Sequence, residues 1–362
     1  MPARRDDDRK TVVHVVSYDI ARGAERYAQA LTDALNTKGL YQHVLLTMFQ
    51  AENDDLDPDV SLEIPRGLMR RVGLDPRAIW RLRGALRRLR PAALVAHGGE
   101  PAKYVALADG GIPYAYLIIG SSHPRLASPI RRALRSLYIG RAAALVTVSD
   151  GLAREVRAEI GDDARLQIIP NGRDPQLYRP TEDGGREAPR VIFVGHLEDQ
   201  KRPFLFLDLI DEILARGVSV SAAMVGGGPL LAEVRARAER LGVEVLGPRD
   251  DVPALLAESD LLVLTSKPPE GMPGVLIEAG LCGLPVVTTD VPGAREVVES
   301  GETGLVVGIE DFGGLSDAVE SLLRDEGLRA SMGAAARDRC VAAFSLDASA
   351  DRWDTLLQEI TR

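Results

Sequence analysis

The sequence of 362 residues contains little cysteine and no long apolar run. Its two cysteines, Cys282 and Cys340, have neither metal-type spacing nor the pattern of a disulfide framework, so we expect both to be small buried residues. No stretch reaches the roughly 18 consecutive apolar residues of a transmembrane helix. The N-terminal segment MPARRDDDRK also lacks the apolar core of a signal peptide, and we therefore expect a cytoplasmic protein.

Charge is distributed unevenly along the chain. The net charge is −9, yet residues 1–180 carry 27 basic and 21 acidic side chains, and the remainder carries 17 and 32. The acidic total argues against general nucleic-acid binding, so no nucleic acid is expected as a partner. The basic excess lies in residues 66–141, where 15 Arg and Lys face only Asp75, Glu100 and Asp109. This region, which includes Trp80, suits peripheral contact with an anionic membrane or an anionic acceptor; the alternative is a sheet-covering helix with solvated arginines.

Short hydrophobic strands alternate with amphipathic helices in both halves of the sequence. This pattern predicts an α/β fold with two doubly wound domains, each built on a parallel sheet of about six strands. The length suits two domains of roughly 150 residues each. The segment 171–190, rich in Pro, Gly and charge, predicts the linker. We expect domains at 1–175 and 186–345, followed by a C-terminal helix at 346–362 that packs back towards the first domain.

The segment EGMPGVLIEAGLCGLPVVTTD, residues 270–290, places two carboxylates around a turn that contains Gly and Pro. Because it follows the strand-like run LLVLTS, Glu270 is expected beyond the carboxyl end of a strand, where open α/β sheets bind ligands. The run from Val275 predicts a helix whose N-terminus attracts phosphate or sugar oxygens, and Glu278 lies about one turn into it. Carboxylates accept hydrogen bonds from sugar or ribose hydroxyls. The alternative is a surface loop followed by an acidic first helical turn.

A companion loop follows the strand-like run RVIFVG. Gly195 leaves room for a ligand to approach the backbone. Lys201 and Arg202 come within the same loop, and basic groups in this place suit a diphosphate. A solvated pair of basic side chains would give the same pattern.

Three further features follow predicted strands. Gly23 comes after the first strand and resembles a phosphate-approach loop, although an ordinary strand-to-helix turn explains it as well. The segment VGGGP at 225–229 indicates only a glycine-rich turn. His97 and His123 are either polar or acid–base groups of a site, or structural histidines.

Taken in order, these segments resemble glycosyltransferase family 4, the retaining nucleotide-sugar enzymes of GT-B fold. The resemblance covers nearly the whole chain, and its strongest part is Glu270-x7-Glu278 within residues 270–298. The other matching segments are GAER (23–26), SDGLAREV (149–156), IIPNGRD (168–174), FVGHLEDQK (193–201), MVGGGP (224–229), LGPRDDVPALLAESDLLVLTS (246–266) and GETGLVV (301–307).

The resemblance implies two Rossmann-like domains that face an interdomain cleft. It also implies a UDP- or GDP-linked sugar as donor and a hydroxyl on a glycan, glycolipid or small molecule as acceptor. No metal and no other cofactor is expected, because cations and helix N-termini would stabilise the leaving nucleoside diphosphate. Domain closure would bring donor and acceptor together and exclude water.

The same resemblance assigns roles to residues. Glu270 would contact hydroxyls of the donor sugar, Glu278 would hold the ribose, and Lys201 would neutralise phosphate charge. The candidate catalytic residues are Glu270, Lys201, His97 and His123. The candidate donor-binding residues are Gly23, Gly195, His196, Lys201, Arg202, Arg249, Glu270, Gly271, Met272, Pro273, Gly274 and Glu278.

The sequence departs from the family pattern at three places. His196 stands where the family often has arginine, so we expect Arg202 or another cation to compensate. Ile119 occupies the position at which a strand of the family usually ends in a sugar-contacting histidine, and His123 follows four residues later. Arg22 replaces the first residue of the usual double glycine.

Two other functions remain compatible with the sequence. A non-catalytic two-lobed protein could bind sugars or nucleotides with the same architecture, but it would not need the glutamate pair or the phosphate-binding cations. An epimerase acting on a nucleotide sugar would share the fold and differ in its products.

Overall fold

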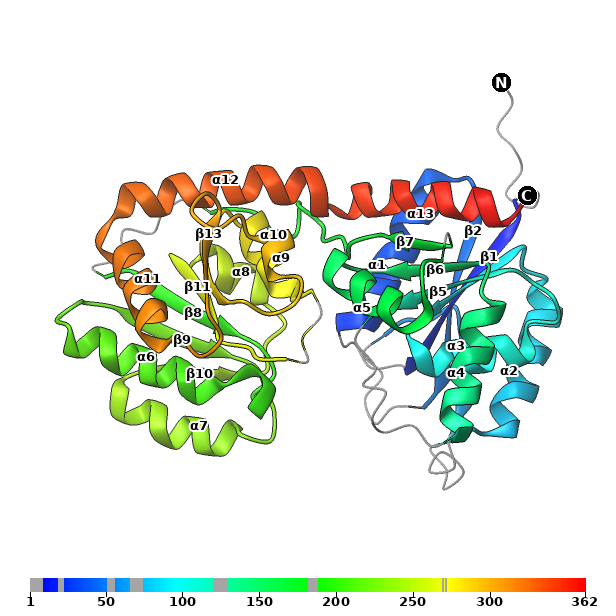
Figure 1. Cartoon of the computed structure of the whole chain (residues 1–362), viewed down its shortest axis with the longest axis horizontal. Coiled ribbons are helices and arrows are strands. Elements are labelled where there is room, and N and C mark those ends of the chain that lie inside the picture. The colour runs from blue at the N-terminus through cyan, green and yellow to red at the C-terminus, as the bar shows by residue number, and fades with distance from the viewer. Residues whose placement is uncertain are drawn as a thin grey trace. The chain divides into compact units, whose positions relative to one another are not determined.

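A computed structural model describes residues 9–18, 23–50, 56–65, 74–119, 129–163, 165–181, 188–268, 270 and 272–362, with backbone only at 23, 24 and 129–131 (Figure 1). The chain divides into two compact units, each described here by itself. Unit 1 comprises Met1–Gly172 and Leu346–Arg362, and unit 2 comprises Arg173–Ser345.

Unit 1 contains a parallel sheet of seven strands in the order β3-β2-β1-β4-β5-β6-β7. The strands are β1 (Thr11–Tyr18), β2 (Gln42–Phe49), β3 (Val60–Ile64), β4 (Ala93–His97), β5 (Tyr114–Ile118), β6 (Ala144–Thr147) and β7 (Leu166–Ile168). Every residue of β4 and β5 is buried. Strands buried on both faces are typical of a parallel sheet that helices cover on both sides.

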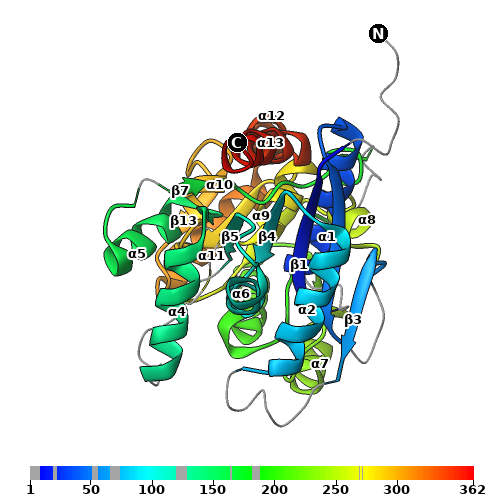
Figure 2. The ribbon, with the colours of Figure 1, turned by 90° about the vertical axis from the view of Figure 1, so that its right-hand side faces the viewer.

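The helices of unit 1 are α1 (Gly23–Lys38), α2 (Pro76–Leu89), α3 (Gly99–Ala108), α4 (Pro129–Arg141), α5 (Asp150–Ile160) and α13 (Leu346–Ile360). Helices α2, α3 and α4 pack in succession (Figure 1). The connection β1-α1-β2 runs across the sheet in the opposite direction to β4-α3-β5, so right-handed crossovers place α1 on the other face. Figure 2 shows α1 beside β1.

The C-terminal helix α13 belongs to unit 1 and packs against α1. Trp353 is fully buried, and its Nε1–H donates to the hydroxyl of Tyr27 at 3.1 Å. The same hydroxyl lies 2.7 Å from the hydroxyl of Ser349. These contacts join two helices that lie more than 300 residues apart in sequence, so the last helix completes the core that the first helix begins.

Unit 2 contains a parallel sheet of six strands in the order β10-β9-β8-β11-β12-β13. The strands are β8 (Arg190–Val194), β9 (Ser221–Val225), β10 (Glu244–Gly247), β11 (Leu261–Leu264), β12 (Val286–Thr289) and β13 (Gly304–Val307). The helices are η4 (Asp199–Lys201), α6 (Pro203–Ala215), α7 (Leu231–Ala238), η5 (Glu239–Leu241), α8 (Val252–Ala257), α9 (Gly274–Leu281), α10 (Ala294–Val297), α11 (Phe312–Arg324) and α12 (Glu326–Phe344).

The predicted class of two doubly wound α/β sheets is confirmed, and so is the burial of Cys282 and Cys340. The prediction of about six strands holds for unit 2, whereas unit 1 has a seventh strand, β3. The sequence pattern did not predict this strand. It is a short edge strand with Ser61 and Glu63 exposed, so it carries little hydrophobic signal. Among the described residues, no helix is long and apolar enough to cross a membrane.

Strand order reverses at one point in each sheet, between β1 and β4 in unit 1 and between β8 and β11 in unit 2. Ligands of open α/β sheets bind beyond the carboxyl ends of the strands that flank this point. The loops that follow β8 and β11 are therefore where unit 2 is expected to hold a ligand.

Two glycines of the loop after β9, Gly226 and Gly228, pack directly against the backbone of the loop after β8. Gly226 has φ +141°, and a Cβ atom built on it would collide with the carbonyl oxygen of Gly195. A Cβ atom on Gly228 would lie 2.8 Å from the backbone nitrogen of Leu197. Backbone hydrogen bonds close the contact, with the N–H of Leu197 donating to the carbonyl of Gly227 at 2.8 Å. The glycine-rich segment is thus a packing surface for the neighbouring loop, beyond the simple turn that the sequence indicates.

A diagonal of three buried histidines crosses neighbouring strands in unit 1. Nδ1 of His14 on β1 lies 3.1 Å from Nε2 of His97 on β4, and its Nε2 lies 3.0 Å from Nδ1 of His43 on β2. Each contact needs one N–H and one unprotonated nitrogen, so the three rings are coupled through their tautomers. The outer nitrogens, Nε2 of His43 and Nδ1 of His97, are buried and have no partner among the described residues.

Burial keeps these imidazoles neutral. It lowers the pKa of His97 to about 3. It also lowers the pKa of His43 to about 4, with a further contribution from the charge of Arg9. The pKa of His14 falls well below its usual value, first through burial and then through its two histidine neighbours. The chain of rings is therefore an uncharged polar connection inside the core.

Acidification is expected to destabilise the protein through these histidines. Their folded pKa values lie below the unfolded value of about 6.5, so their stabilising contribution is complete above that pH and declines as pH falls towards the folded values. Each buried neutral histidine should cost about 1.4 kcal/mol of unfolding free energy per pH unit in this window. Denaturant unfolding between about pH 7.5 and about pH 4.5 measures the slope.

The variant His43→Gln should show a shallower decline of stability than the wild type, because one proton-binding group is lost from the unfolded state. The exposed His196 of unit 2 supplies the matched control, and His196→Gln should keep the wild-type slope. Equal slopes for His43→Gln and the wild type would contradict the interpretation.

The glycine contact between the loops gives a second prediction. Gly226→Ala should lower the unfolding free energy by about 2 kcal/mol or more, because the added methyl group meets backbone and the residue has positive φ. Gly313→Ala is the control: its Cβ would meet only an oxygen of Asp311 at 3.9 Å, inside helix α11, so it should be neutral or slightly stabilising. Equal stabilities of the two variants in denaturant unfolding would refute the packing argument.

Candidate functional site

The loops that follow β8 and β11 are joined by short hydrogen bonds. Thr265, just after β11, donates its hydroxyl to the carbonyl oxygens of Lys201 at 2.8 Å and Arg202 at 3.0 Å. The backbone N–H of Lys267 donates to the carbonyl of Gln200 at 2.8 Å. Both loops lie at the switch point of the unit 2 sheet, so these bonds fix the geometry where a ligand is expected.

Lys201 and Glu270 meet across this junction. Nζ of Lys201 lies 2.5 Å from Oε2 of Glu270, and the two side chains are only 16% and 13% exposed. Lys201 ends the short helix η4, and Glu270 stands in the loop before α9. The sequence placed each residue after a strand, and the structure brings their charged groups into direct contact. A largely buried cation and carboxylate in one place can bind a ligand that carries both negative charge and hydroxyl groups.

The N-terminus of helix α9 lies next to this pair in sequence. Met272 and Pro273 are buried, and Pro273 occupies the N-cap position, where no side chain accepts a hydrogen bond among the described residues. Gly274 is the first helical residue. In the first turn, the N–H of Leu276 donates to the carbonyl of Pro273 at 3.1 Å. The N–H groups of Gly274 and Val275 have no side-chain cap among the described residues and can donate to anionic oxygens. Gly271 lies outside the described residues.

Glu278 lies in the middle of α9 and forms a second buried pair. Its Oε1 accepts a hydrogen bond from Nε of Arg173 at 2.8 Å, with side-chain exposures of 15% and 16%. The sequence predicted a role for Glu278 but none for Arg173. The only sequence signal was the position of Arg173 within the segment IIPNGRD, and the pair joins residues 105 positions apart.

The remaining donor-binding candidates of unit 2 take other contacts. Arg202 has φ +49°, and its guanidinium donates to the carbonyl of Ile309 at 2.6 Å and pairs with Glu310. It is thus engaged with the loop after β13. Arg249 is exposed and forms an ion pair with Asp251.

Gly195 and His196 form the first part of the loop after β8. A Cβ atom on Gly195 would lie 3.6 Å from the ring of Phe193, an ordinary contact. The close approach of the two loops therefore requires glycine at Gly226, in the loop after β9, and not at Gly195. His196 is exposed, while the next residue, Leu197, is fully buried and anchors the loop. His196 therefore presents its ring to solvent at the switch point.

Unit 1 contributes three of the candidates. Gly23 is the first residue of α1, just beyond the loop that follows β1. His97 ends β4 at the carboxyl edge of the sheet, where it is buried and bonded to His14. It is therefore no isolated histidine but the end of the buried chain. His123 lies outside the described residues.

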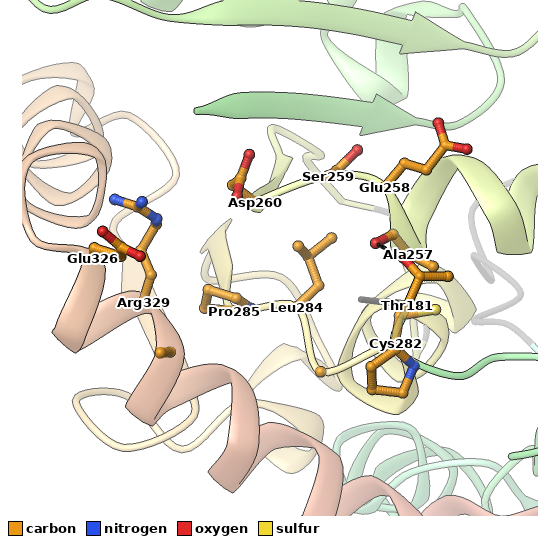
Figure 3. A pocket seen from close by; sticks show the side chains of 13 residues that line it. Thr181, Ala257, Glu258, Ser259, Asp260, Cys282, Leu284, Pro285, Glu326 and Arg329 are labelled. Atoms are coloured by element: carbon orange, nitrogen blue, oxygen red, sulfur yellow. Dashed lines mark hydrogen bonds between the residues drawn. The ribbon is translucent and has the colours of Figure 1, made fainter. Parts of the chain in front are cut away.

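A cavity of about 620 Å³ lies at the amino ends of the unit 2 strands, opposite to the carboxyl ends that carry the candidate site (Figure 3). Asp260, which precedes β11, and Pro285, which precedes β12, line it together with Glu326 and Arg329 of α12. Because the strands are parallel, these residues mark the amino ends, whereas Lys201 and Glu270 follow carboxyl ends. The cavity is thus separate from the candidate site. Within the described part of the chain, no group of three or more His, Cys, Asp or Glu is arranged to hold a metal ion.

Two family descriptions match the chain, one in each half. "Glycosyltransferase Family 4" matches residues 21–177, and "Glycosyl transferases group 1" matches residues 188–325. Together they include the loops after β8 and β11 and the helix α9.

Known proteins are similar over much of the chain. N-acetyl-alpha-D-glucosaminyl L-malate synthase of Bacillus anthracis is 27% identical over 277 residues, covering 73% of this chain and 70% of the relative. GDP-mannose-dependent alpha-(1-6)-phosphatidylinositol monomannoside mannosyltransferase of Mycolicibacterium smegmatis is 32% identical over 229 residues, covering 57% of this chain and 59% of the relative, which is less than two thirds of its length.

A solved structure of Anabaena Alr3699/HepE in complex with UDP matches with a TM-score of 0.81 and 20% identity, covering 97% of this chain and all of that one. At this identity the likeness speaks for the fold, two Rossmann-like domains of GT-B type. Together with the two family matches and the named relatives, it shows that the chain belongs to the family 4-like glycosyltransferases.

Proposed function

We propose that this glycosyltransferase moves a sugar from a UDP- or GDP-linked donor to a hydroxyl of its acceptor, with retention of anomeric configuration and without a metal ion. The observation that carries the proposal is the Lys201–Glu270 pair at the switch point of unit 2. It sets a cation and a hydrogen-bond acceptor side by side, next to the N-terminus of α9.

The charges of the site match the needs of the reaction. The bond between the anomeric carbon and the diphosphate oxygen breaks, the acceptor oxygen bonds to that carbon on the same face, and its proton passes to the leaving phosphate. Negative charge therefore grows on the diphosphate as the bond breaks. Lys201 and the uncapped N–H groups of α9 would stabilise this charge, which is electrostatic catalysis by groups already in place.

Glu270 and Glu278 would recognise the uncharged parts of the donor. On this proposal Glu270 accepts hydrogen bonds from sugar hydroxyls, while its partner Lys201 turns to phosphate. Glu278 accepts hydrogen bonds from the ribose. Met272, Pro273 and Gly274 lie between the two glutamates in sequence, and their backbone would face the sugar and diphosphate.

The relatives support the choice of donor class. The name of the Mycolicibacterium enzyme includes GDP-mannose, and the HepE structure contains UDP. Both are nucleoside diphosphates, and the charge arrangement of unit 2 suits that shared part of the donor. A two-lobed binding protein or an epimerase would share the fold, and the products of the reaction separate these alternatives.

Removal of the Glu270 carboxylate tests the proposal. Glu270→Gln and Glu270→Ala should lower the rate of sugar transfer, or of donor hydrolysis, by about 100-fold or more, because the carboxylate orients both the sugar and Lys201. The measurement is product formation from UDP- and GDP-sugars. Glu244→Gln, which changes an exposed carboxylate of the same unit, should keep the wild-type rate.

Folded Glu270 variants that turn over at the wild-type rate would exclude this role. Tight binding of the donor by the wild type without turnover, against a broad set of acceptors, would favour a binding protein. An altered nucleotide sugar as the only product would favour an epimerase.

We further propose that unit 1 contacts an anionic membrane through helix α2. Trp80 is 77% exposed, and Arg83, Arg87 and Arg88 are exposed on the same face at helical spacing. Arg81 instead donates to the carbonyl of Leu62. An exposed tryptophan among arginines suits the interface of a bilayer with anionic headgroups.

Replacement of this face should weaken binding to anionic vesicles. Arg83, Arg87 and Arg88 changed together to Ser should reduce co-sedimentation with phosphatidylserine-containing liposomes at least tenfold, at about 1 kcal/mol per arginine. The control changes three exposed arginines elsewhere, Arg240, Arg324 and Arg352, to Ser. Wild-type binding that does not depend on anionic lipid would remove the membrane proposal.

A further inference from the structure

We propose that Arg173 is a positioning residue that holds the carboxylate of Glu278 for the ribose of the donor and so makes the site selective for ribonucleotides. The inference rests on the proposed function, in which Glu278 contacts the ribose. It adds a residue that lies outside the loops after β8 and β11 and outside α9, at the first position of unit 2.

The contact between the two side chains is specific in its atoms. Nε of Arg173 donates to Oε1 of Glu278 at 2.8 Å. Among the residues that the structure describes, the hydrogen bond to this carboxylate engages Oε1 alone, which leaves Oε2 for a further donor. Two hydroxyls of a ribose need an acceptor of fixed orientation, and a carboxylate held at one oxygen presents the other in a defined direction.

Burial makes the pairing necessary. The side chains of Arg173 and Glu278 are 16% and 15% exposed. A carboxylate in such a place has lost most of its water and needs a compensating charge and hydrogen bonds. Without Arg173, the Glu278 side chain would gain alternative rotamers that reach towards solvent, so it would lose the orientation that the ribose requires.

The backbone of Arg173 is fixed at the same time. Its N–H donates to the carbonyl of Phe344, the last residue of α12, at 3.0 Å. The backbone of Arg173 also forms an isolated parallel β-bridge with Ser345. The following turn is closed by the N–H of Gln176, which donates to the carboxylate of Asp174 at 2.8 Å. The guanidinium of Arg173 therefore extends from a backbone segment whose position is fixed by hydrogen bonds.

The guanidinium also lies over the first residue of α9. A Cβ atom built on Gly274 would collide with Nη2 of Arg173 and would lie 3.6 Å from Oε1 of Glu278. A cation beside the positive end of a helix is unfavourable for the helix itself, so helix stabilisation does not explain the arginine. The charge of Arg173 instead compensates the carboxylate of Glu278. A positive charge beside the N-terminus of α9 also suits an anionic donor.

Nucleotide binding with and without a ribose hydroxyl tests the inference. Calorimetry on the full chain compares UDP with 2′-deoxy-UDP and GDP with 2′-deoxy-GDP. The wild type should prefer the ribonucleotide about tenfold, the value of about one hydrogen bond to a charged group. Arg173→Met should bind the ribonucleotide about tenfold more weakly and the deoxynucleotide nearly as well as before, so the preference falls to about twofold or less.

A double-mutant cycle shows whether Arg173 acts through Glu278. Glu278→Gln should also lose the preference, and Arg173→Met should add little to it in the double variant. In turnover, Arg173→Met should raise KM for the donor with little change in kcat, as expected for a residue that positions a distant part of the donor. Arg324→Met, an exposed arginine of the same unit, is the matched control. If Arg173→Met does not fold, Arg173→Lys keeps the charge, lacks the Nε donor and should show a partial loss of the preference.

Three outcomes overturn the inference. A folded Arg173→Met variant with the wild-type preference for ribonucleotides removes the role of Arg173. Additive effects in the double-mutant cycle show that it does not act through Glu278. A wild-type protein that binds no nucleoside diphosphate overturns the proposed function as well.

Discussion

The junction between the loops after β8 and β11 is the contact on which the candidate site depends. Thr265 donates to two carbonyl oxygens of the neighbouring loop, and the Lys201–Glu270 pair sits directly on this junction. Neither charged side chain could stay so buried alone, because an unpaired buried charge is costly. Gly226 packs directly against the backbone of Gly195 in the loop after β8, and this contact supports the junction. The backbone arrangement and the charge pairing therefore require each other.

This pairing also explains how the site can be ordered before a donor arrives. Lys201 and Glu270 hold each other in one geometry, so on the proposed function little side-chain entropy would be lost when phosphate and sugar hydroxyls replaced the mutual contact. This exchange would be local, because Lys201 would gain an anion and Glu270 would gain hydroxyl donors. Groups arranged in this way can respond to the charge that grows on a leaving diphosphate without further rearrangement.

Sequence patterns predicted the parts of this arrangement that are encoded locally. Hydrophobic runs marked most strands, and the places of Lys201 and Glu270 after two of them predicted that both belong to one edge of a sheet. Contacts between distant segments gave no such signal. Arg173 pairs with Glu278 across 105 positions, and the three histidines of unit 1 come from strands whose order follows only from the folded topology. Likewise, the sequence indicated only a turn at Gly226. The residue that it packs against, Gly195, lies in the loop after a different strand, so the contact could not be predicted from the local sequence. Whether the candidate residues bind a donor remains a prediction.

Three contacts connect helix α9 to α12, α12 to Arg173, and Arg173 back to α9. Gly280 on α9 lies so close to α12 that a Cβ atom there would collide with Sγ of Cys340. The carbonyl of Phe344, at the end of α12, accepts the backbone N–H of Arg173. The side chain of Arg173 then returns to Glu278 on α9. Because each step is a direct contact, a shift of α9 relative to α12 would have to stretch the Arg173–Glu278 pair or break the glycine packing. The orientation of Glu278 is thus determined by the packing of the whole C-terminal side of unit 2, and not by α9 alone.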